Sequence, residues 1–273
     1  MTFKLLKVGS DTEFFLRDLK TGLPVTAIGR FGGTKKDPKP VLDIPGFCIQ
    51  EDNVMPEVNI PAADNYESFY QNCDKILSWL KEEAASQGCS VDVAASMNFT
   101  TEQLDHPQAK TIGCEPDYCV WTREENQFDE TKRHLLESLR SAGGHIHVSF
   151  TNTKEKVTQE DQELLVMFMD VYLGLPSVIQ DRDTERRKLY GKAGSFRFKP
   201  YGIEYRVLSN FWFKSARDSA WVFNQVQLAV NSMNNKGLIR MLFDDAEEIQ
   251  TAINIQDESL SHRLMDSWGV YTP

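Results

Sequence analysis

The sequence predicts a mixed α+β fold with a largely antiparallel sheet. Segments with strand patterns and segments with helical patterns follow one another irregularly, unlike the regular β-α-β order of a doubly wound parallel sheet. No repeat period and no linker rich in Ser, Pro or Gly divides the 273 residues, a length that one large domain can fill. We therefore expect a single domain that spans residues 1–273.

The amino-terminal 60 residues carry mostly strand patterns. Residues 5–17 and 25–28 predict strands, and residues 29–40, GRFGGTKKDPKP, predict a long loop because they combine glycine and proline. The Gly32-Gly33 pair favours a turn over a phosphate cradle. The same loop carries basic side chains in an acidic chain, namely Arg30, Lys35, Lys36 and Lys39. We interpret it either as a lid over phosphate or as a plain connection.

The pattern changes to a helical one from Asp64, which we take as the N-cap. Apolar residues then recur at helical spacing until Gly88 ends the run; they are Phe69, Cys73, Ile76, Leu77 and Leu80. Further strands are predicted near 90–99, 113–121 and 144–150. Further helices are predicted for 130–140, for 158–173 after a capping box at Thr158 and Asp161, for 215–237 and after 244.

Composition and charge exclude several classes of protein. With 41% hydrophobic and 26% charged residues the chain is neither disordered nor collagen-like, and its net charge of −10 argues against broad capture of nucleic acid. No uninterrupted apolar stretch approaches the roughly 20 residues of a membrane helix, and no signal-peptide core follows Met1. The cysteines are odd in number, which favours buried thiols. We expect a cytoplasmic protein without a membrane partner, and the sequence gives no direct sign of a nucleic-acid partner.

Polar side chains two positions apart recur on five of the predicted strands. Residues i and i+2 of a strand share a face and lie about 6.6 Å apart, so such a pair can converge on one site. The pairs are Asp11 and Glu13, Glu57 and Asn59, Glu115 and Asp117, His145 and His147, and Glu204 and Arg206. Any one pair alone fits a solvated strand face, but five such faces with almost no lysine fit that interpretation less well.

Acids that gather on one face need cations, because two carboxylates about 4 Å apart repel by about 4 kcal/mol at an effective dielectric constant near 20. Carboxylate oxygens with one imidazole suit Mg²⁺ or Mn²⁺, and two or three ions could be held. The pair His145 and His147 would suit zinc equally, and a histidine satisfied in the core is the ordinary alternative for either residue.

Residues 181–206 supply the opposite charge. Guanidinium groups bind phosphate in a bidentate manner, and metal-binding acids joined by arginines are typical of phosphoryl transfer. A solvated helix end is an equally good interpretation for Arg186, Arg187 and Lys188, whereas Arg206 shares a strand face with Glu204. The basic residues are Arg182, Arg186, Arg187, Lys188, Lys192, Arg197, Lys199 and Arg206.

Four segments, in this order along the chain, resemble the glutamine synthetase-like carboxylate-amine ligases, most closely the phage-type amidoligase family. GSDTEFFL resembles the first acidic strand, and QEDNVMPEVNIP resembles the next metal-binding segment. GGHIHVSF resembles the His-x-His strand, and GSFRFKPYGIEYR resembles the arginine strand followed by the Glu-x-Arg strand. The resemblance implies a glutamine synthetase-like catalytic domain, with a curved antiparallel sheet and helices packed on one face.

The resemblance also implies a role for individual residues. The implied metal ligands are Asp11, Glu13, Glu57, His145, Glu204 and an upstream acid, Glu51 or Asp52. Arg197 and Arg206 would hold the nucleotide γ-phosphate and the acyl phosphate, with Glu204 beside them, and Lys192 and Arg187 are further candidates for nucleotide binding. Glu115, Asp117, His147 and Asn59 are expected to face substrate.

The implied activity is ATP-dependent formation of an amide or peptide bond through an acyl phosphate, with ATP, Mg²⁺ or Mn²⁺, a carboxylate and an amine. Glutamine synthetase has an amino-terminal domain that completes its site across subunits. Here the acidic strand already begins near Asp11, so we expect that domain to be missing and the amine to be larger than ammonium.

Two other functions compete with the ligase interpretation. A zinc-dependent hydrolase could use His145 and His147 with Glu115 as general base, although this leaves the arginine strand without a role. A non-catalytic binding protein could retain a degenerate ligase fold, although candidate ligands on every one of these strands argue against decay.

Overall fold

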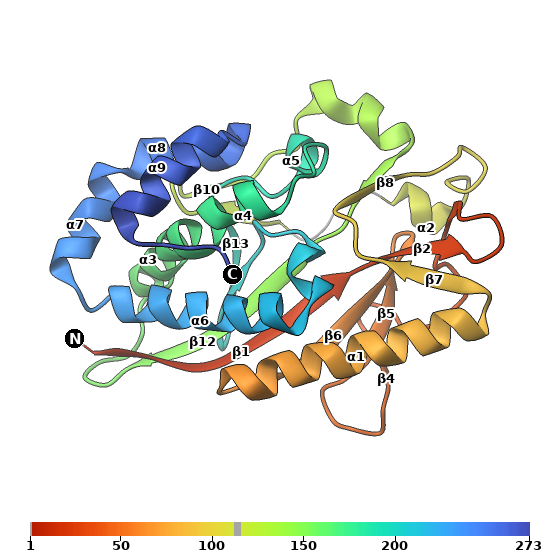
Figure 1. Cartoon of the computed structure of the whole chain (residues 1–273), viewed down its shortest axis with the longest axis horizontal. Coiled ribbons are helices and arrows are strands. Elements are labelled where there is room, and N and C mark those ends of the chain that lie inside the picture. The colour runs from red at the N-terminus through yellow and green to blue at the C-terminus, as the bar shows by residue number, and fades with distance from the viewer. Residues whose placement is uncertain (1, 112–115) are drawn as a thin grey trace.

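A nine-stranded antiparallel sheet is the central feature of the computed structural model, which describes residues 2–111 and 116–273 (Figure 1). The strand order is β10-β9-β13-β14-β12-β1-β6-β5-β4, so β1 and β12 lie in the middle of the sheet. The strands are β1 Phe3–Glu13, β4 Lys39–Pro40, β5 Cys48–Asp52, β6 Met55–Ala63, β9 Tyr118–Cys119, β10 Glu124–Glu125, β12 Gly144–Asn152, β13 Ser195–Lys199 and β14 Gly202–Tyr205.

Helices cover one face of this sheet, where α1 contacts β6, α6 contacts β1 and α3 contacts β14 (Figure 1). The carboxy-terminal helices continue this layer, because α9 contacts α4 and α8 contacts both of them. The predicted α+β class, with a largely antiparallel sheet and helices on one face, is therefore confirmed. The helices are α1 Tyr66–Ser86, α2 Pro107–Lys110, α3 Gln159–Met169, α4 Leu175–Gln180, α5 Arg186–Leu189, α6 Ala216–Ser232, α7 Lys236–Asp244, α8 Ala246–Ile255 and α9 Glu258–Trp268.

Strand pleating explains why the site faces away from the helices. Ile146 and Val148 on β12 are fully buried in the hydrophobic core, whereas His145 and His147 point to the opposite face. The pairing of β1 with β12 places Asp11 directly opposite His145. The two central strands therefore present their polar residues together on the face that α1, α3 and α6 leave open.

Several element boundaries differ from those predicted. The predicted strand at 5–17 is divided, because β1 ends at Glu13 and β2 (Phe15–Asp18) joins a smaller sheet with β3 (Pro24–Val25) and β7 (Cys89–Asp92). The predicted strand at 90–99 is likewise divided between β7 and β8 (Ser96–Asn98). Part of the predicted loop 29–40 forms β4 at its end.

The predicted helices also needed adjustment. Asn65, not Asp64, is the N-cap of α1, since its side chain accepts a hydrogen bond of 2.8 Å from the Ser68 amide. The capping box at Thr158 is confirmed, and the helix after it continues through a π-helix, η2 (Asp170–Gly174). The segment at 130–140 forms a 3₁₀ helix, η1 (Glu130–Glu137), and then β11 (Leu139–Ser141). The predicted helix at 215–237 is α6, which ends at Ser232, and α7 follows as a separate helix. The 3₁₀ helix η3 (Asn210–Lys214) precedes α6.

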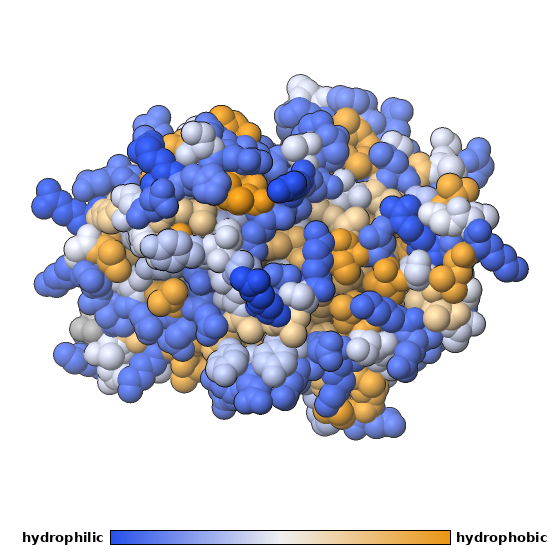
Figure 2. Space-filling model, viewed as in Figure 1, coloured by the Kyte–Doolittle hydropathy of each residue, from blue (hydrophilic) through white to orange (hydrophobic). Residues whose placement is uncertain are grey.

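Among the described residues, one helical stretch, Gln159–Gln180, is long and apolar enough to cross a membrane, but 83% of its apolar 18-residue window is buried inside the protein, as in a core helix. The face shown in Figure 2 is mostly hydrophilic, with apolar patches scattered between polar side chains. The four described cysteines are free thiols, and two of them, Cys73 and Cys89, are buried; Cys114 lies outside the described residues.

Candidate active site

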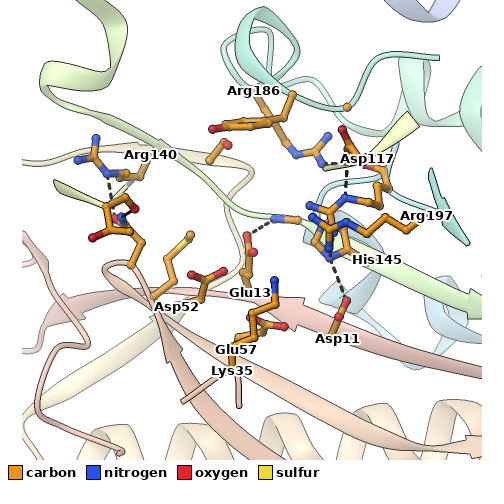
Figure 3. Close-up of a pocket in the computed structure, with 18 of the residues that line it drawn as sticks. Asp11, Glu13, Lys35, Asp52, Glu57, Asp117, Arg140, His145, Arg186 and Arg197 are labelled. Carbon is orange, nitrogen blue, oxygen red and sulfur yellow. Dashed lines mark hydrogen bonds and ion pairs between the residues drawn. The ribbon is translucent and has the colours of Figure 1, made fainter. Parts of the chain in front are cut away.

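A pocket opens on the sheet face that the helices leave uncovered, over the ends of β1, β6 and β12 (Figure 3). Acidic side chains occupy its centre, and arginines approach from the other walls. The predicted residues Asp11, Glu13, Glu57 and His145 all line it, as do Asp117, Arg197 and Arg206. Each of the five strand pairs predicted from the sequence thus contributes at least one residue to this pocket.

Three carboxylates form the first acidic cluster of the pocket, Glu13, Asp52 and Glu57, with ligand atoms within 4.8 Å of one another. Glu13 and Glu57 lie opposite each other on β1 and β6. The Gly143 amide donates to Glu13 Oε2 over 2.6 Å. Burial and the charge of Asp52 raise the pKa of Glu13 to about 8, and burial with Asp11 and Glu13 raises the pKa of Glu57 well above its usual value. Burial and mutual repulsion therefore both oppose ionisation of the acids in this cluster.

Asp11, His147 and Glu204 form a second acidic cluster, again with ligand atoms within 4.8 Å. The two oxygens of Asp11 contact different imidazoles, His145 Nδ1 at 2.9 Å and His147 Nε2 at 3.1 Å. Burial opposes ionisation of Asp11, but His147 and His145 outweigh it and hold the pKa of Asp11 well below its usual value. Asp11 is thus a carboxylate shared by two imidazoles.

Cations surround Glu204 in the second acidic cluster. Arg197 Nη1 lies 3.2 Å from Glu204 Oε1, Lys199 Nζ lies 2.7 Å from Oε2, and Arg206 Nη1 also donates to Oε1. Burial and Asp11 oppose its ionisation, yet His145, Arg206 and Arg197 lower the pKa of Glu204 to about 2. Glu204, Arg197 and Arg206 are therefore grouped, as the sequence predicted, and both arginines contact Glu204.

The acid upstream of β6 that joins the pocket is Asp52, and Glu51 lies elsewhere. Gln50 pairs with Glu57 and donates to its Oε2 over 2.7 Å, so Gln50 and Asp52 share the pocket face of β5. Glu51 points to the other face, where its carboxylate accepts hydrogen bonds from the backbone amides of residues 29, 31 and 32. We therefore correct the candidate ligand from Glu51 to Asp52.

Two predicted nucleotide-binding residues lie outside the pocket. Arg187 is buried and donates to the Ile253 carbonyl over 2.9 Å and to Ser177 Oγ, so it ties α5 to the carboxy-terminal helices. Lys192 points to the carbonyl of Asn254 at 3.3 Å. Neither side chain lines the first pocket, and nucleotide binding by Arg187 or Lys192 stays a prediction. The burial of Arg187 excludes a solvated helix end there.

The predicted substrate-facing residues are divided between two places. Asp117 lines the first pocket and accepts a hydrogen bond of 3.2 Å from Arg206 Nε. His147 and Asn59 line a second pocket on the same sheet face, together with Ser149 and Tyr201, and Tyr201 hydrogen-bonds to His147 Nδ1. Glu115 lies outside the described residues.

Two further arginines line the pocket: Arg186, for which a solvated helix end is an equally good interpretation of the sequence, and Arg140, which has no signal in the sequence. Arg186 is buried and donates to the carbonyls of Ala142 and Val207 over 3.0 and 2.7 Å. Arg140 donates to backbone carbonyls that include Ala109, at 2.9 Å. Both arginines line the pocket through contacts between distant segments, which local patterns do not reveal.

The glycines before His145 are required by close packing. A Cβ at Gly143 would lie 2.3 Å from His145 Nε2, and a Cβ at Gly144 would lie 2.4 Å from the Ser209 carbonyl oxygen. Both distances are far below van der Waals contact. The GGH sequence therefore keeps the imidazole of His145 beside Asp11.

The donor set of both acidic clusters fits divalent cations. Glu13, Asp52 and Glu57 offer only carboxylate oxygens, the ligands that Mg²⁺ and Mn²⁺ prefer, and a bound cation would offset the burial and the Asp52 charge that raise the pKa of Glu13. Asp11, His147 and Glu204 offer two carboxylates and one imidazole, a mixed set that Mn²⁺ also accepts.

Comparison with known proteins agrees with this chemistry. Residues 138–268 match the family described as phage phiEco32-like COOH.NH2 ligase-type 2, a segment that contains His145, Arg197, Glu204 and Arg206. The chain thus resembles the phage-type carboxylate-amine ligases, as predicted from its motifs. The match supports a ligase that forms carbon-nitrogen bonds between a carboxylate and an amine.

Two solved structures also resemble the chain, each at 12% sequence identity. A bifunctional glutathione synthetase from Pasteurella multocida aligns with a TM-score of 0.46 over 97% of this chain and 49% of its own. A novel glutamine synthase homolog aligns with a TM-score of 0.42 over 97% of this chain and 66% of its own. The chain thus spans about half the length of the first structure. No curated protein matches the sequence.

Proposed function

We propose that the protein is an ATP-dependent carboxylate-amine ligase that forms an amide or peptide bond through an acyl-phosphate intermediate. The observation that carries this proposal is the arrangement of the two acidic clusters beside Arg197 and Arg206 on one sheet face, with the first cluster lining the first pocket. Active sites for phosphoryl transfer usually combine acidic residues that bind divalent cations with arginines. The family match over residues 138–268 supports the same class of reaction.

The first acidic cluster (Glu13, Asp52 and Glu57) would hold one Mg²⁺ or Mn²⁺, and the second (Asp11, His147 and Glu204) would hold another. His145 contacts Asp11 through Nδ1 and is a further candidate ligand. When bound, such ions neutralise phosphate oxygens and so favour transfer of the phosphoryl group.

The two pockets suggest where each substrate binds. The second pocket offers Asn59, Ser149, His147 and the half-exposed ring of Tyr201, which suits a nucleotide whose phosphates reach the second acidic cluster. The first pocket, with Arg206 and Asp117 in its wall, suits the carboxylate and the amine. The first acidic cluster lines the first pocket, whereas the second has Asp11 in the first pocket and His147 in the second.

The reaction requires activation because a carboxylate has no good leaving group. A carboxylate oxygen attacks the γ-phosphorus, the bond from this phosphorus to the β-γ bridging oxygen breaks, and ADP leaves with the electron pair. Arg197 and Arg206 would donate hydrogen bonds to the phosphoryl oxygens. The amine nitrogen then attacks the carbonyl carbon, phosphate leaves with the carbon-oxygen bonding electrons, and the nitrogen loses a proton to solvent.

A zinc hydrolase explains the pocket less well. His145 Nδ1 and His147 Nε2 both contact Asp11, so the imidazoles surround a carboxylate and do not converge as a pair. The hydrolase also leaves Arg197 and Arg206 without a role.

One assay separates the ligase, the hydrolase and a non-catalytic binding protein. ADP release is measured with Mg²⁺ or Mn²⁺ across a panel of carboxylates and amines, and the purified protein is analysed for bound metal. ADP release that requires both a carboxylate and an amine supports the ligase. Stoichiometric zinc with hydrolysis and no ADP release would replace this proposal with the hydrolase, and neither activity would favour a binding protein.

A further inference from the structure

Lys35 lines the first pocket, and the proposed reaction gives it no role. It lies in a tight two-residue turn, because the backbone groups of Thr34 and Asp37 exchange two hydrogen bonds of 3.0 Å. Lys35 and Lys36 are the central residues of this turn. The turn therefore holds two adjacent lysines, of which Lys35 lines the pocket and Lys36 does not.

The turn is fixed to the sheet by its neighbours. Glu51 accepts hydrogen bonds from the amides of Gly29, Phe31 and Gly32 over 2.8, 2.9 and 2.8 Å. Gly33 adopts a positive φ of 79°, and a Cβ there would lie 2.3 Å from the Ile49 carbonyl oxygen, so this backbone is pressed against β5. The segment that carries Lys35 is thus held in place against β5 and forms part of the pocket wall.

Lys35 approaches the acids from the side opposite to the arginines. Figure 3 shows its amino group directed toward Glu57 and Glu13. The turn precedes β4 at one edge of the sheet, whereas Arg197 lies on β13 and Arg206 follows β14, beyond the central strands β1 and β12. A group bound between the acidic clusters would therefore have cations on two sides.

We propose that Lys35 is a catalytic residue of the ligase, whose ammonium group binds the reacting carboxylate and the phosphoryl group that it receives. This inference rests on the proposed function. As the carboxylate oxygen bonds to the γ-phosphorus and ADP leaves, negative charge is shared among the oxygens of both groups. A compact ammonium with three donors can follow that charge, and it keeps its own protons throughout.

A purely structural role would make a different prediction. If Lys35 served only to balance Glu13, Asp52 and Glu57, its loss would alter metal binding and stability and would leave the phosphoryl group unaffected. The test must therefore separate the binding of metal from the binding of a phosphoryl mimic.

The experiment compares Lys35→Ala with the matched control Lys36→Ala, after thermal unfolding has confirmed that both are folded. Calorimetry measures the affinity for Mn²⁺ alone and for ADP with aluminium fluoride and Mn²⁺, which mimics the phosphoryl group in transfer. We expect Lys35→Ala to weaken binding of the mimic at least about tenfold, as for loss of a charged hydrogen bond, and to bind Mn²⁺ within about twofold of wild type. Lys36→Ala should bind both within about twofold of wild type.

A second measurement does not depend on the variants. Acetylation of the wild-type protein, read by mass spectrometry, should become several-fold slower at Lys35 when the mimic is bound and should stay unchanged at Lys36. Equal behaviour of the two lysines in both measurements, or loss of Mn²⁺ binding in Lys35→Ala, overturns the role of Lys35 alone. Failure of the wild-type protein to bind the mimic overturns the proposed function and this role with it.

Discussion

Arg197 and Glu204 lie directly opposite each other on β13 and β14, and their side chains form a buried ion pair of 3.2 Å. The carboxylate of Glu204 is therefore compensated by neighbouring cations. Glu13, in the other acidic cluster, is not compensated in this way, and its pKa is raised to about 8 while that of Glu204 is lowered to about 2. Replacing each of these two glutamates by uncharged glutamine should thus change the stability of the metal-free protein in opposite directions.

Glu13→Gln should raise the stability of the metal-free protein. Burial and Asp52 raise the pKa of Glu13 from its usual 4.5 to about 8, so the wild-type protein loses stability as the pH rises from about 4.5 through 8. The amide removes that loss while still accepting the Gly143 hydrogen bond. The melting temperature in EDTA at pH 8.5 should rise by roughly 2–4 °C per kcal/mol recovered. A lower melting temperature than wild type at that pH would contradict the assignment.

Glu204→Gln should lower the stability of the metal-free protein near neutral pH. Its carboxylate, with a pKa of about 2, contributes stability above its usual pKa of 4.5, and this is lost as the pH falls toward 2. The amide would leave Arg197, Arg206 and Lys199 without their carboxylate. The deficit in melting temperature relative to wild type should be largest above pH 4.5 and should shrink as the pH falls toward 2.

Both Glu204→Gln and Glu13→Gln should abolish ATP turnover, and retained turnover in either would refute its catalytic assignment.

Arg206→Lys should be nearly as damaging as Arg206→Ala. The guanidinium of Arg206 contacts Glu204 through Nη1 and Asp117 through Nε at 3.2 Å, a forked arrangement that one ammonium cannot reproduce. We expect both variants to lose at least about 100-fold in kcat/KM for ATP turnover. If Arg206→Lys keeps most of the wild-type activity, Arg206 acts only as a diffuse charge.

Arg187→Ala should affect stability and spare nucleotide binding. Its guanidinium donates to the Ile253 carbonyl and to Ser177 Oγ, so removal leaves buried acceptors without partners. We expect a loss of about 2–4 kcal/mol in the free energy of unfolding by urea. The affinity for ATP with Mg²⁺, measured below the unfolding transition, should stay within about twofold of wild type. A large loss of affinity would restore the assignment made from the sequence.

Glu51→Ala should release the segment that Glu51 holds. Its carboxylate accepts the amides of Gly29, Phe31 and Gly32, and Lys35 and Lys36 follow shortly after them. Trypsin should therefore cleave the variant faster at these lysines than it cleaves wild type, by roughly tenfold if the anchor is lost. Nucleotide with Mg²⁺ should slow this cleavage in the wild-type protein if the loop also covers phosphate. Identical cleavage in all cases would make the loop a plain connection.

The sequence predicted the convergence of the strand pairs because the two-residue period of a strand is a local property. Asp11, Glu13 and Glu57 needed only that period and the expectation of adjacent strands. The choice between Glu51 and Asp52 needed more, since it depends on the register that places Gln50 opposite Glu57. A one-residue difference in register moves every side chain to the other face.

The arginines show the same limit more strongly. Arg186 and Arg187 are neighbours in the short helix α5, yet Arg186 lines the pocket and Arg187 contacts Ser177 and residue 253. Adjacent helical positions point about 100° apart, and only the placement of α5 against the sheet decides which one reaches the site. Local sequence patterns contain no information about that placement.

The strand β1 contributes one acid to each acidic cluster, Asp11 to the second and Glu13 to the first. The distance between two bound cations would then be set by the two-residue repeat of β1 from Asp11 to Glu13. Changes in side-chain conformation could alter this distance only slightly. Replacing one ligand residue in either acidic cluster would change which cation that cluster prefers, while the distance between the two cations stayed the same. An insertion of one residue between these acids would send one of them to the helix-covered face and leave a centre with a single ion.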